Sequence, residues 1–304
     1  MKVALHTISY GGFWGQKVLS VEEIIGKAKA FGYDGIEIVA KRPHASPLEW
    51  TREKCLPVRD LLAKSGMTCF AVAGYTDFTN PGTEFRDKEL LYLREAIRMT
   101  KDLGCKILRV FAGGMGALRE GVNNRVAREK AIEQLKAAVP WAADAGITLA
   151  LQNHPPVTNC PEDVLEIIEG VGSPVLQAVI DAPLFADVSE DTVVAGVKLL
   201  GKRIVHVHTS DYVLRPSNPY PVPGGSIRGF ATRYVPLGEG CLPFAAYVKA
   251  LHDVGFQGAL AYEMCSFLPG GGSEANLDKI AKAALATTRK WIADAAKGGK
   301  KAKK

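Results

Sequence analysis

Polar side chains with metal-binding and proton-transfer chemistry stand at the ends of four apolar stretches. Each stretch is apolar along its length and then changes to polar residues, as a buried parallel strand does where its tip opens into a site. The first of these stretches is ITLALQNH, residues 147–154, which is followed at once by two prolines. The stretches end at Gln152, Asn153 and His154; at Asp181 in LQAVID; at His208 and Asp211 in IVHVHTSD; and at Glu263 in GALAYE.

One amide oxygen, one imidazole nitrogen and two carboxylates form a donor set for a hard divalent cation. Oxygen-rich sets of this kind suit Mn²⁺ or Mg²⁺, and the absence of a thiolate argues against a structural zinc site. We therefore expect Gln152, Asp181, His208 and Glu263 to bind a divalent metal ion. The alternative is that these residues are hydrogen-bonded groups that only cap strand ends.

A repeated alternation of strands and helices would position these residues. Side-chain alternation makes each proposed ligand the last inward residue of its strand. We expect strands over residues 3–9, 35–40, 67–73, 106–111, 147–154, 175–181, 204–208 and 259–263. We expect helices over residues 21–31, 48–65, 88–103, 124–145, 161–169, 189–200, 242–254 and 274–296.

This alternation predicts a single (β/α)8 TIM barrel over residues 1–296, with the site at the carboxyl ends of the strands. A doubly wound sheet is the alternative, but no GxGxxG follows the first strand. The connection from Asp211 to Gly240 is long and rich in proline and glycine, which favours a lid or binding loop.

Composition excludes several partners. The formal charge is +6, and subtracting the five lysines of residues 297–304 leaves +1, so the body offers no basic surface for nucleic acid. We expect that tail to be disordered.

Six dispersed cysteines suit reduced thiols, and no segment has the length of a signal peptide or membrane helix, so we expect a cytoplasmic protein.

The phrases GYDGIEI, LALQNH, VID, HVHTSD, PLGEG and YE resemble the sugar phosphate isomerase/epimerase superfamily, the xylose isomerase-like TIM barrels. The resemblance extends over the chain except its lysine tail. It implies a metal site with Glu, Asp, His and Glu ligands, which fall on Gln152, Asp181, His208 and Glu263. Gln152 departs from this pattern, which has a glutamate at that position. Its amide can donate an oxygen to a metal but cannot accept a proton.

The resemblance implies an isomerase or epimerase that acts on an unphosphorylated keto-sugar, polyol or glycoside through an enediolate. Glu263 and His154 are the candidate catalytic bases. Because Gln152 removes one carboxylate base, the alternative is a lyase or dehydratase that acts by β-elimination on a 3-keto-sugar, like the C-glycoside deglycosidase barrel subunits or the keto-inositol dehydratases. We predict no phosphate substrate, since the glycine runs AGGMG and PGGGS are too short to indicate a cradle.

Other polar and aromatic residues are expected near the strand tips. We predict that substrate contacts come from Glu37, His6, His44, His206 and Trp14. Glu37 could instead pair with Lys41 or Arg42, and the histidines could be buried structural groups. Arg109 could face the helices, and Asp211 could orient His208 or a loop. Aromatic residues expected on the same rim, or as loop-packing anchors, are Phe13, Trp50, Tyr75, Phe78 and Phe111.

Two other functions remain open at this level. A related barrel cleaves DNA at abasic sites and uses more histidines, but Leu184 stands where that resemblance would require one. A catalytically inactive sugar-binding subunit is the other possibility. The resemblance also allows a homo-oligomer, or a hetero-oligomer with a second subunit.

Overall fold

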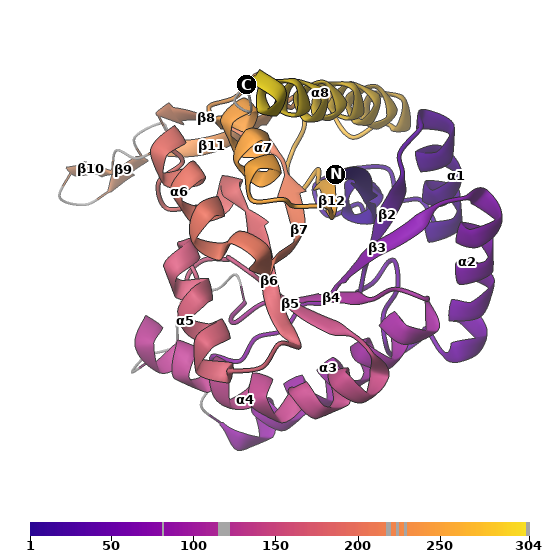
Figure 1. Cartoon of the computed structure of the whole chain (residues 1–304), viewed down its shortest axis with the longest axis vertical. Coiled ribbons are helices and arrows are strands. Elements are labelled where there is room, and N and C mark those ends of the chain that lie inside the picture. Colours follow the sequence, from indigo (N-terminus) through magenta and orange to yellow (C-terminus); the bar gives the residue numbers. More distant parts are fainter. Residues whose placement is uncertain (81, 115–121, 217–219, 223–224, 228–229, 302–304) are drawn as a thin grey trace.

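A closed barrel of eight parallel strands forms the centre of the molecule (Figure 1). The computed structural model describes residues 1–80, 82–114, 122–216, 220–222, 225–227 and 230–301. The strands follow one another around the barrel in the order β1, β12, β7, β6, β5, β4, β3, β2. The predicted single (β/α)8 barrel is therefore confirmed.

The barrel strands are short, and their residues are mostly buried, as expected of strands covered by helices on the outside. Their bounds are β1 Lys2–His6, β2 Gly35–Val39, β3 Thr68–Ala73, β4 Ile107–Val110, β5 Thr148–Gln152, β6 Leu176–Asp181, β7 Ile204–Thr209 and β12 Ala259–Tyr262. The strand register places His6 beside Glu37, and Asp181 beside His208. Residues far apart in the chain therefore meet at the carboxyl ends of the strands.

Eight α-helices surround the barrel within the described residues (Figure 1). The sequence signals at their ends are realised: Ser20 caps the first helix in a capping box with Glu23, and Gly32 ends it at a φ of 95°. The helices are α1 Val21–Phe31, α2 Arg52–Ser65, α3 Thr83–Asp102, α4 Asn124–Ala145, α5 Pro161–Val171, α6 Glu190–Leu200, α7 Phe244–Asp253 and α8 Glu274–Lys301.

Three helix boundaries differ from the sequence-based expectation by four or five residues, and the others by no more than two. Helix α2 begins at Arg52 rather than at 48, because Thr51 takes the extended N-cap conformation. Helix α3 begins five residues earlier than expected, directly after Gly82. Helix α8 runs to Lys301, five residues beyond the expected end at residue 296. Residues 302–304 lie outside the described part of the chain.

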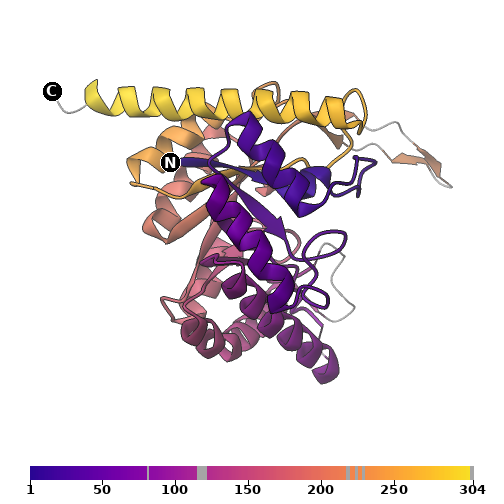
Figure 2. The same ribbon diagram turned by 90° about the vertical axis from the view of Figure 1, so that its right-hand side faces the viewer.

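The long connection after β7 forms antiparallel strands that project from the barrel (Figures 1 and 2). Strand β8 Asp211–Pro216 pairs with β11 Phe230–Val235, and β9 Tyr220–Val222 pairs with β10 Gly225–Ile227. We call residues 211–235 the ribbon. It continues the chain only three residues beyond His208.

The base of the ribbon is fixed by one buried carboxylate. Asp211 Oδ1 accepts hydrogen bonds from the backbone N–H of Tyr212 at 2.9 Å and of Leu242 at 3.3 Å. Its Oδ2 accepts hydrogen bonds from the backbone N–H of Gly238 at 3.0 Å and of Gly240 at 2.9 Å. Of the two roles expected for Asp211, the structure therefore gives it the second, orientation of a loop.

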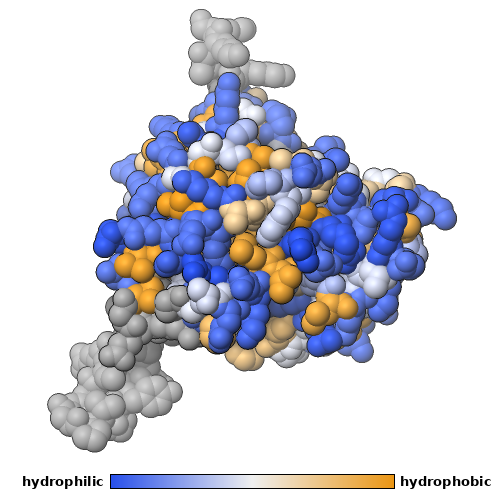
Figure 3. Space-filling view, turned by 90° about the horizontal axis from the view of Figure 1, so that it is seen from below, coloured by the Kyte–Doolittle hydropathy of each residue, from blue (hydrophilic) through white to orange (hydrophobic). Residues whose placement is uncertain are grey.

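The outer surface is that of a barrel covered by amphipathic helices. Figure 3 shows one face, on which hydrophobic residues occur in groups between hydrophilic ones. In the described ranges, no helix combines the length and the apolar character that crossing a bilayer requires.

Candidate active site

The four predicted metal ligands converge at the carboxyl ends of adjacent strands. Gln152 ends β5, Asp181 ends β6, His208 lies in β7 and Glu263 follows β12. Gln152 Nε2 donates a hydrogen bond to Asp181 Oδ2 at 2.8 Å. His208 Nδ1 lies 3.4 Å from Glu263 Oε2 and 3.8 Å from Asp181 Oδ2. The structure therefore brings these four side chains together at one end of the barrel.

Several donor atoms in this group lack the partners that buried polar atoms normally have. Gln152 Oε1, Asp181 Oδ1 and His208 Nδ1 are buried, and none of them makes a hydrogen bond within the described residues. Buried acceptors without partners are costly, and a cation would satisfy all three. Ligand atoms of Asp181, His208 and Glu263 also lie within 4.8 Å of one another. These residues therefore fit a divalent metal ion.

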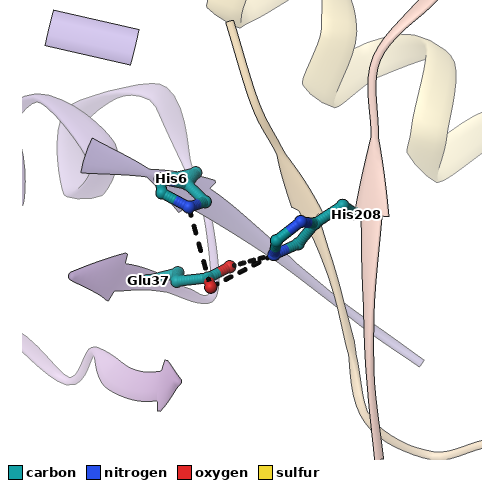
Figure 4. A group of neighbouring side chains, drawn as sticks. All are labelled: His6, Glu37 and His208. Atoms are coloured by element: carbon teal, nitrogen blue, oxygen red, sulfur yellow. Dashed lines mark hydrogen bonds and ion pairs between the residues drawn. The ribbon is translucent and has the colours of Figure 1, made fainter. Parts of the chain in front are cut away.

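Glu37, fully buried, joins three histidines below this group. Its Oε2 lies 2.8 Å from His206 Nε2 and 2.9 Å from His208 Nε2. His6 Nε2 lies 3.6 Å from Glu37 Oε1, and Figure 4 shows His6 and His208 pointing toward the Glu37 carboxylate. Glu37 thus holds His208 by Nε2 and leaves Nδ1 facing Asp181 and Glu263. Such carboxylate–histidine pairs orient metal-binding imidazoles.

The charges of this group are strongly coupled. Burial opposes ionisation of Glu37, but the charges of His208, His6 and His206 hold its pKa well below its usual range. Burial likewise disfavours protonation of His208, yet Glu37 and Glu263 raise its pKa well above 6.5. For Glu263, burial is outweighed by His208 and His6, which lower its pKa to about 2. Without a metal ion, these carboxylates favour the protonated form of His208, and a cation that binds at Nδ1 would displace that proton.

A cavity of about 160 Å³ opens above the four proposed metal ligands, Gln152, Asp181, His208 and Glu263. Gln152, Asp181 and Glu263 reach its floor, and most of the remaining lining is aromatic or cationic. The other lining residues are Ile8, Phe13, Trp14, Lys41, Tyr75, Arg109, Phe111, His154, Leu184, Tyr234 and Cys265. Aromatic surface next to convergent polar groups is typical of a small-molecule site.

His154 faces this cavity with a defined tautomer. Its Nδ1 lies 2.8 Å from the carbonyl oxygen of Pro155, so Nδ1 donates and Nε2 is left as an acceptor. Burial, assisted by the charge of Arg109, lowers the pKa of His154 to about 4. The ring packs against Phe111 with a centroid distance of 4.2 Å. His154 is therefore a neutral, fixed imidazole at neutral pH.

The other predicted site residues fall into two groups. Trp14 lines the cavity, whereas His6, Glu37 and His206 lie beneath the cavity floor. His44 is not brought to the cavity: its Nε2 lies 3.2 Å from the carbonyl oxygen of Leu19.

Of the aromatic residues expected on the rim, Phe13, Tyr75 and Phe111 line the cavity, but Trp50 and Phe78 do not. Phe78 is completely buried, and Trp50 packs against the core from outside the cavity. Both are packing residues rather than rim residues.

Sequence reasoning missed several lining residues. Arg109 lies in β4 and faces the cavity, not the helices. Lys41 does not pair with Glu37, and it reaches the cavity from the loop after β2. Tyr234 and Cys265, with the Cys265 thiol 3.5 Å from the Tyr234 hydroxyl, also had no signal in the sequence. A strict count of alternate positions in the short fourth strand could have found Arg109.

Comparison with known proteins adds to this geometry. A family model described as "Xylose isomerase-like TIM barrel" matches residues 25–291. Fructoselysine 3-epimerase of Shigella flexneri is 27% identical over 264 residues, which cover 82% of this chain and 87% of that protein.

Two solved structures have the same fold. D-psicose 3-epimerase, crystallised in the presence of D-fructose, superposes with a TM-score of 0.77 at 17% identity, covering 96% of this chain and 99% of that chain. The IolI protein with a bound zinc atom superposes with a TM-score of 0.76 at 16% identity, covering 97% of this chain and 99% of that chain.

Proposed function

The chain belongs to the xylose isomerase-like TIM barrel family, as its motifs predict, and from this premise we propose a divalent-metal-dependent isomerase or epimerase. Its substrate would be an unphosphorylated keto-sugar, polyol or glycoside. Sugar epimerases among its relatives support an enzyme that acts on sugars. The proposal is carried by the ligand atoms of Asp181, His208 and Glu263, which lie within 4.8 Å of one another, together with the buried Gln152 Oε1, Asp181 Oδ1 and His208 Nδ1, which have no hydrogen-bond partner among the described residues.

Gln152, Asp181, His208 and Glu263 would hold the metal ion, which we expect to be Mn²⁺ or Mg²⁺. A divalent ion bound there would act as a Lewis acid that favours negative charge at the substrate carbonyl. Glu37 would keep the His208 ring in place through Nε2, at 2.9 Å. The aromatic walls would exclude water from the reacting carbon.

Two side chains can move the proton next to the carbonyl. Glu263 is ionised at neutral pH, because its pKa is lowered to about 2. His154 is neutral and presents Nε2 as an acceptor, because its Nδ1 is engaged by Pro155. Gln152 cannot take a proton. In epimerisation, one of the two bases would remove the proton from one face of the carbon. The other base would first have to take up a proton from solvent, which it would then deliver to the opposite face.

The amide at position 152 favours one alternative reaction. If Glu263 is the sole effective base, proton removal can be followed by departure of a group β to the carbanion. Such an enzyme would be a lyase or dehydratase acting on a 3-keto-sugar. Release of water or of an aglycone, without return of the proton to carbon, distinguishes elimination from epimerisation.

The test is solvent deuterium exchange on a panel of ketohexoses, keto-inositols and 3-keto-glycosides. We expect exchange at the carbon next to the carbonyl when Mn²⁺ is present and none after treatment with EDTA. Glu263→Gln should lower the exchange rate on the order of 100-fold or more, as removal of a general base does. Glu190→Gln, an exposed carboxylate at the start of α6, is the matched control. Full exchange in EDTA or in the Glu263→Gln variant would refute the proposal.

A further inference from the structure

Two cationic side chains face the cavity from the arc of the barrel opposite the metal-binding group. The proposed ligands come from the contiguous strands β5, β6, β7 and β12. Arg109 lies in the next strand, β4, and Lys41 follows β2. The cavity thus has an acidic, metal-binding side and a cationic side.

The cations are fixed against aromatic rings that also line the cavity. Lys41 Nζ lies 3.8 Å from the ring centroid of Tyr75 and 4.3 Å from that of Phe13. The Arg109 guanidinium carbon lies 4.0 Å from the ring centroid of Phe111 and 4.7 Å from that of Tyr75. Such contacts hold a cation in place without neutralising its charge.

Neither cation has a carboxylate partner at ion-pair distance. Among the residues that the structure describes, no Asp or Glu oxygen lies within 4.0 Å of Lys41 Nζ or the Arg109 guanidinium. Arg42, which neighbours Lys41 in sequence, shows the contrast, because it pairs with Glu49 at 2.6 Å. Arg109 is only 1% exposed; its Nη1 donates to the Gly74 carbonyl oxygen at 2.7 Å, and its Nε has no hydrogen-bond partner among the described residues.

Two neighbouring positive charges in a partly closed cavity are costly unless an anion joins them. Burial first, and the charge of Arg109 second, lower the pKa of Lys41 to about 8. Among the described residues that line the cavity, none is a glycine or lies at the amino terminus of an α-helix, and these are the usual sources of backbone N–H groups around a phosphate. A carboxylate fits this lining, because arginine and lysine side chains can bind it without backbone donors, whereas a phosphate site at a loop or helix end usually adds backbone N–H groups.

We propose that the substrate is a sugar acid, whose carboxylate binds between Lys41 and Arg109 while its carbonyl faces the side formed by β5, β6, β7 and β12. This inference rests on the proposed function and specifies its substrate class. The rival explanation is that the two cations only balance Asp181 and Glu263 across the cavity. That explanation predicts no preference for a substrate carboxylate.

Calorimetric binding to the Mn²⁺-loaded full chain tests the inference with matched probes. D-fructose, D-fructuronate and D-fructose 6-phosphate share one ketose skeleton and differ at carbon 6 in carrying a hydroxyl, a carboxylate or a phosphate. D-tagatose and D-tagaturonate form a second matched pair. We expect at least one uronate to bind on the order of tenfold more tightly than its neutral partner, the usual effect of one charge-assisted hydrogen bond.

Lys41→Met removes the charge and keeps the apolar stem between the two rings. It should bring uronate affinity to within about twofold of the affinity for the neutral ketose, so the ratio of the two affinities is compared between variant and parent. Arg109→Lys keeps a positive charge at position 109 and should retain part of the preference for the uronate. Lysine is chosen as the replacement because removing the charge of a buried arginine could disturb the fold. Arg42→Met, which removes a neighbouring cation outside the cavity, should leave the preference unchanged.

Equal binding of uronate and neutral ketose, tighter binding of the phosphate than of the uronate, or an unchanged preference in Lys41→Met would overturn the inference. Binding is measured without turnover, so the two proposals fail separately. Deuterium exchange without a carboxylate preference would keep the enzyme and remove the sugar acid. A Lys41-dependent preference without exchange on any carbonyl substrate would keep the anion site and remove the reaction.

Discussion

Replacing Gln152 with glutamate restores the carboxylate found in the family pattern and should make the metal-free protein less stable. In the structure, Gln152 Nε2 donates to Asp181 Oδ2 at 2.8 Å, and both side chains are buried. Gln152→Glu converts this hydrogen bond into a contact between two carboxylates. The metal-free protein therefore loses an attraction and gains a repulsion at the same point.

The size of the effect follows from these contacts. A hydrogen bond to a charged group contributes about 1.5–3 kcal/mol. Repulsion between the carboxylates adds to this loss, but protonation of one of them limits the total, so we expect about 2–4 kcal/mol at pH 7. For a domain of this size that corresponds to a fall in melting temperature on the order of 5–10 °C. A bound divalent cation should reverse the effect, because the new carboxylate then faces positive charge.

Differential scanning calorimetry in EDTA and in saturating Mn²⁺ measures both halves of this prediction. Gln152→Glu should melt below the parent in EDTA, and its metal-induced rise in melting temperature should exceed that of the parent. Lowering the pH to 5 in EDTA should narrow the difference, since the shared proton relieves the repulsion. Gln177→Glu makes the same change in β6 at a site where Gln177 Nε2 bonds the carbonyl oxygen of Pro174, and it is the control.

Unchanged stability of metal-free Gln152→Glu, or an equal metal-induced rise in both proteins, would refute the reasoning. The first result would mean that the Gln152–Asp181 contact has no energetic weight. The second would mean that position 152 does not face the bound cation.

Three further predictions concern other contacts of the site and the ribbon. Glu37→Gln should weaken Mn²⁺ binding about 10–100-fold in calorimetry, because His208 loses the carboxylate that orients it; unchanged affinity would contradict this role. Asp211→Asn should lower the free energy of unfolding in urea by about 3–6 kcal/mol, because its amide group must face two of the four backbone N–H donors; a loss below 1 kcal/mol would contradict the geometry. Burial lowers the pKa of His154 from 6.5 to about 4 in the folded protein. As the pH falls from 6.5 toward 4, the unfolded chain therefore binds a proton that the folded protein does not, and the free energy of unfolding decreases. The free energy of unfolding of His154→Gln should therefore fall by up to about 3 kcal/mol less than that of the parent over that interval, and parallel stability curves would disprove the assignment.

Most of the fold could be predicted because its signals are local. Capping residues such as Ser20 and left-handed glycines such as Gly32 mark helix ends, and buried apolar runs mark the strands. The start of α3 escaped prediction because residues 83–87 contain a single apolar residue, Phe85, and so show no apolar period. The end of α8 also escaped prediction, because composition alone did not reveal that the helix continues to Lys301.

The convergence of Gln152, Asp181, His208 and Glu263 could also be predicted, because parallel strands in a barrel bring their last inward residues together. The cationic half could not. Arg109 lies within a four-residue strand, where one position decides whether a side chain faces the lumen or the helices. Lys41 and Tyr234 reach the cavity from segments outside the barrel strands, and their direction depends on packing that no periodicity describes.

The hydrogen bonds of Asp211 also bear on how related barrels could be recombined. A Cβ atom at Gly240 would lie 2.0 Å from Asp211 Oδ1, so a side chain at position 240 would displace the carboxylate from its four N–H donors. Chimeras that exchange the ribbon alone would separate these partners. A segment from 211 to 242 keeps the Asp211 carboxylate together with its four backbone N–H donors. It should be transferable between family members without disturbing the strand that carries His208.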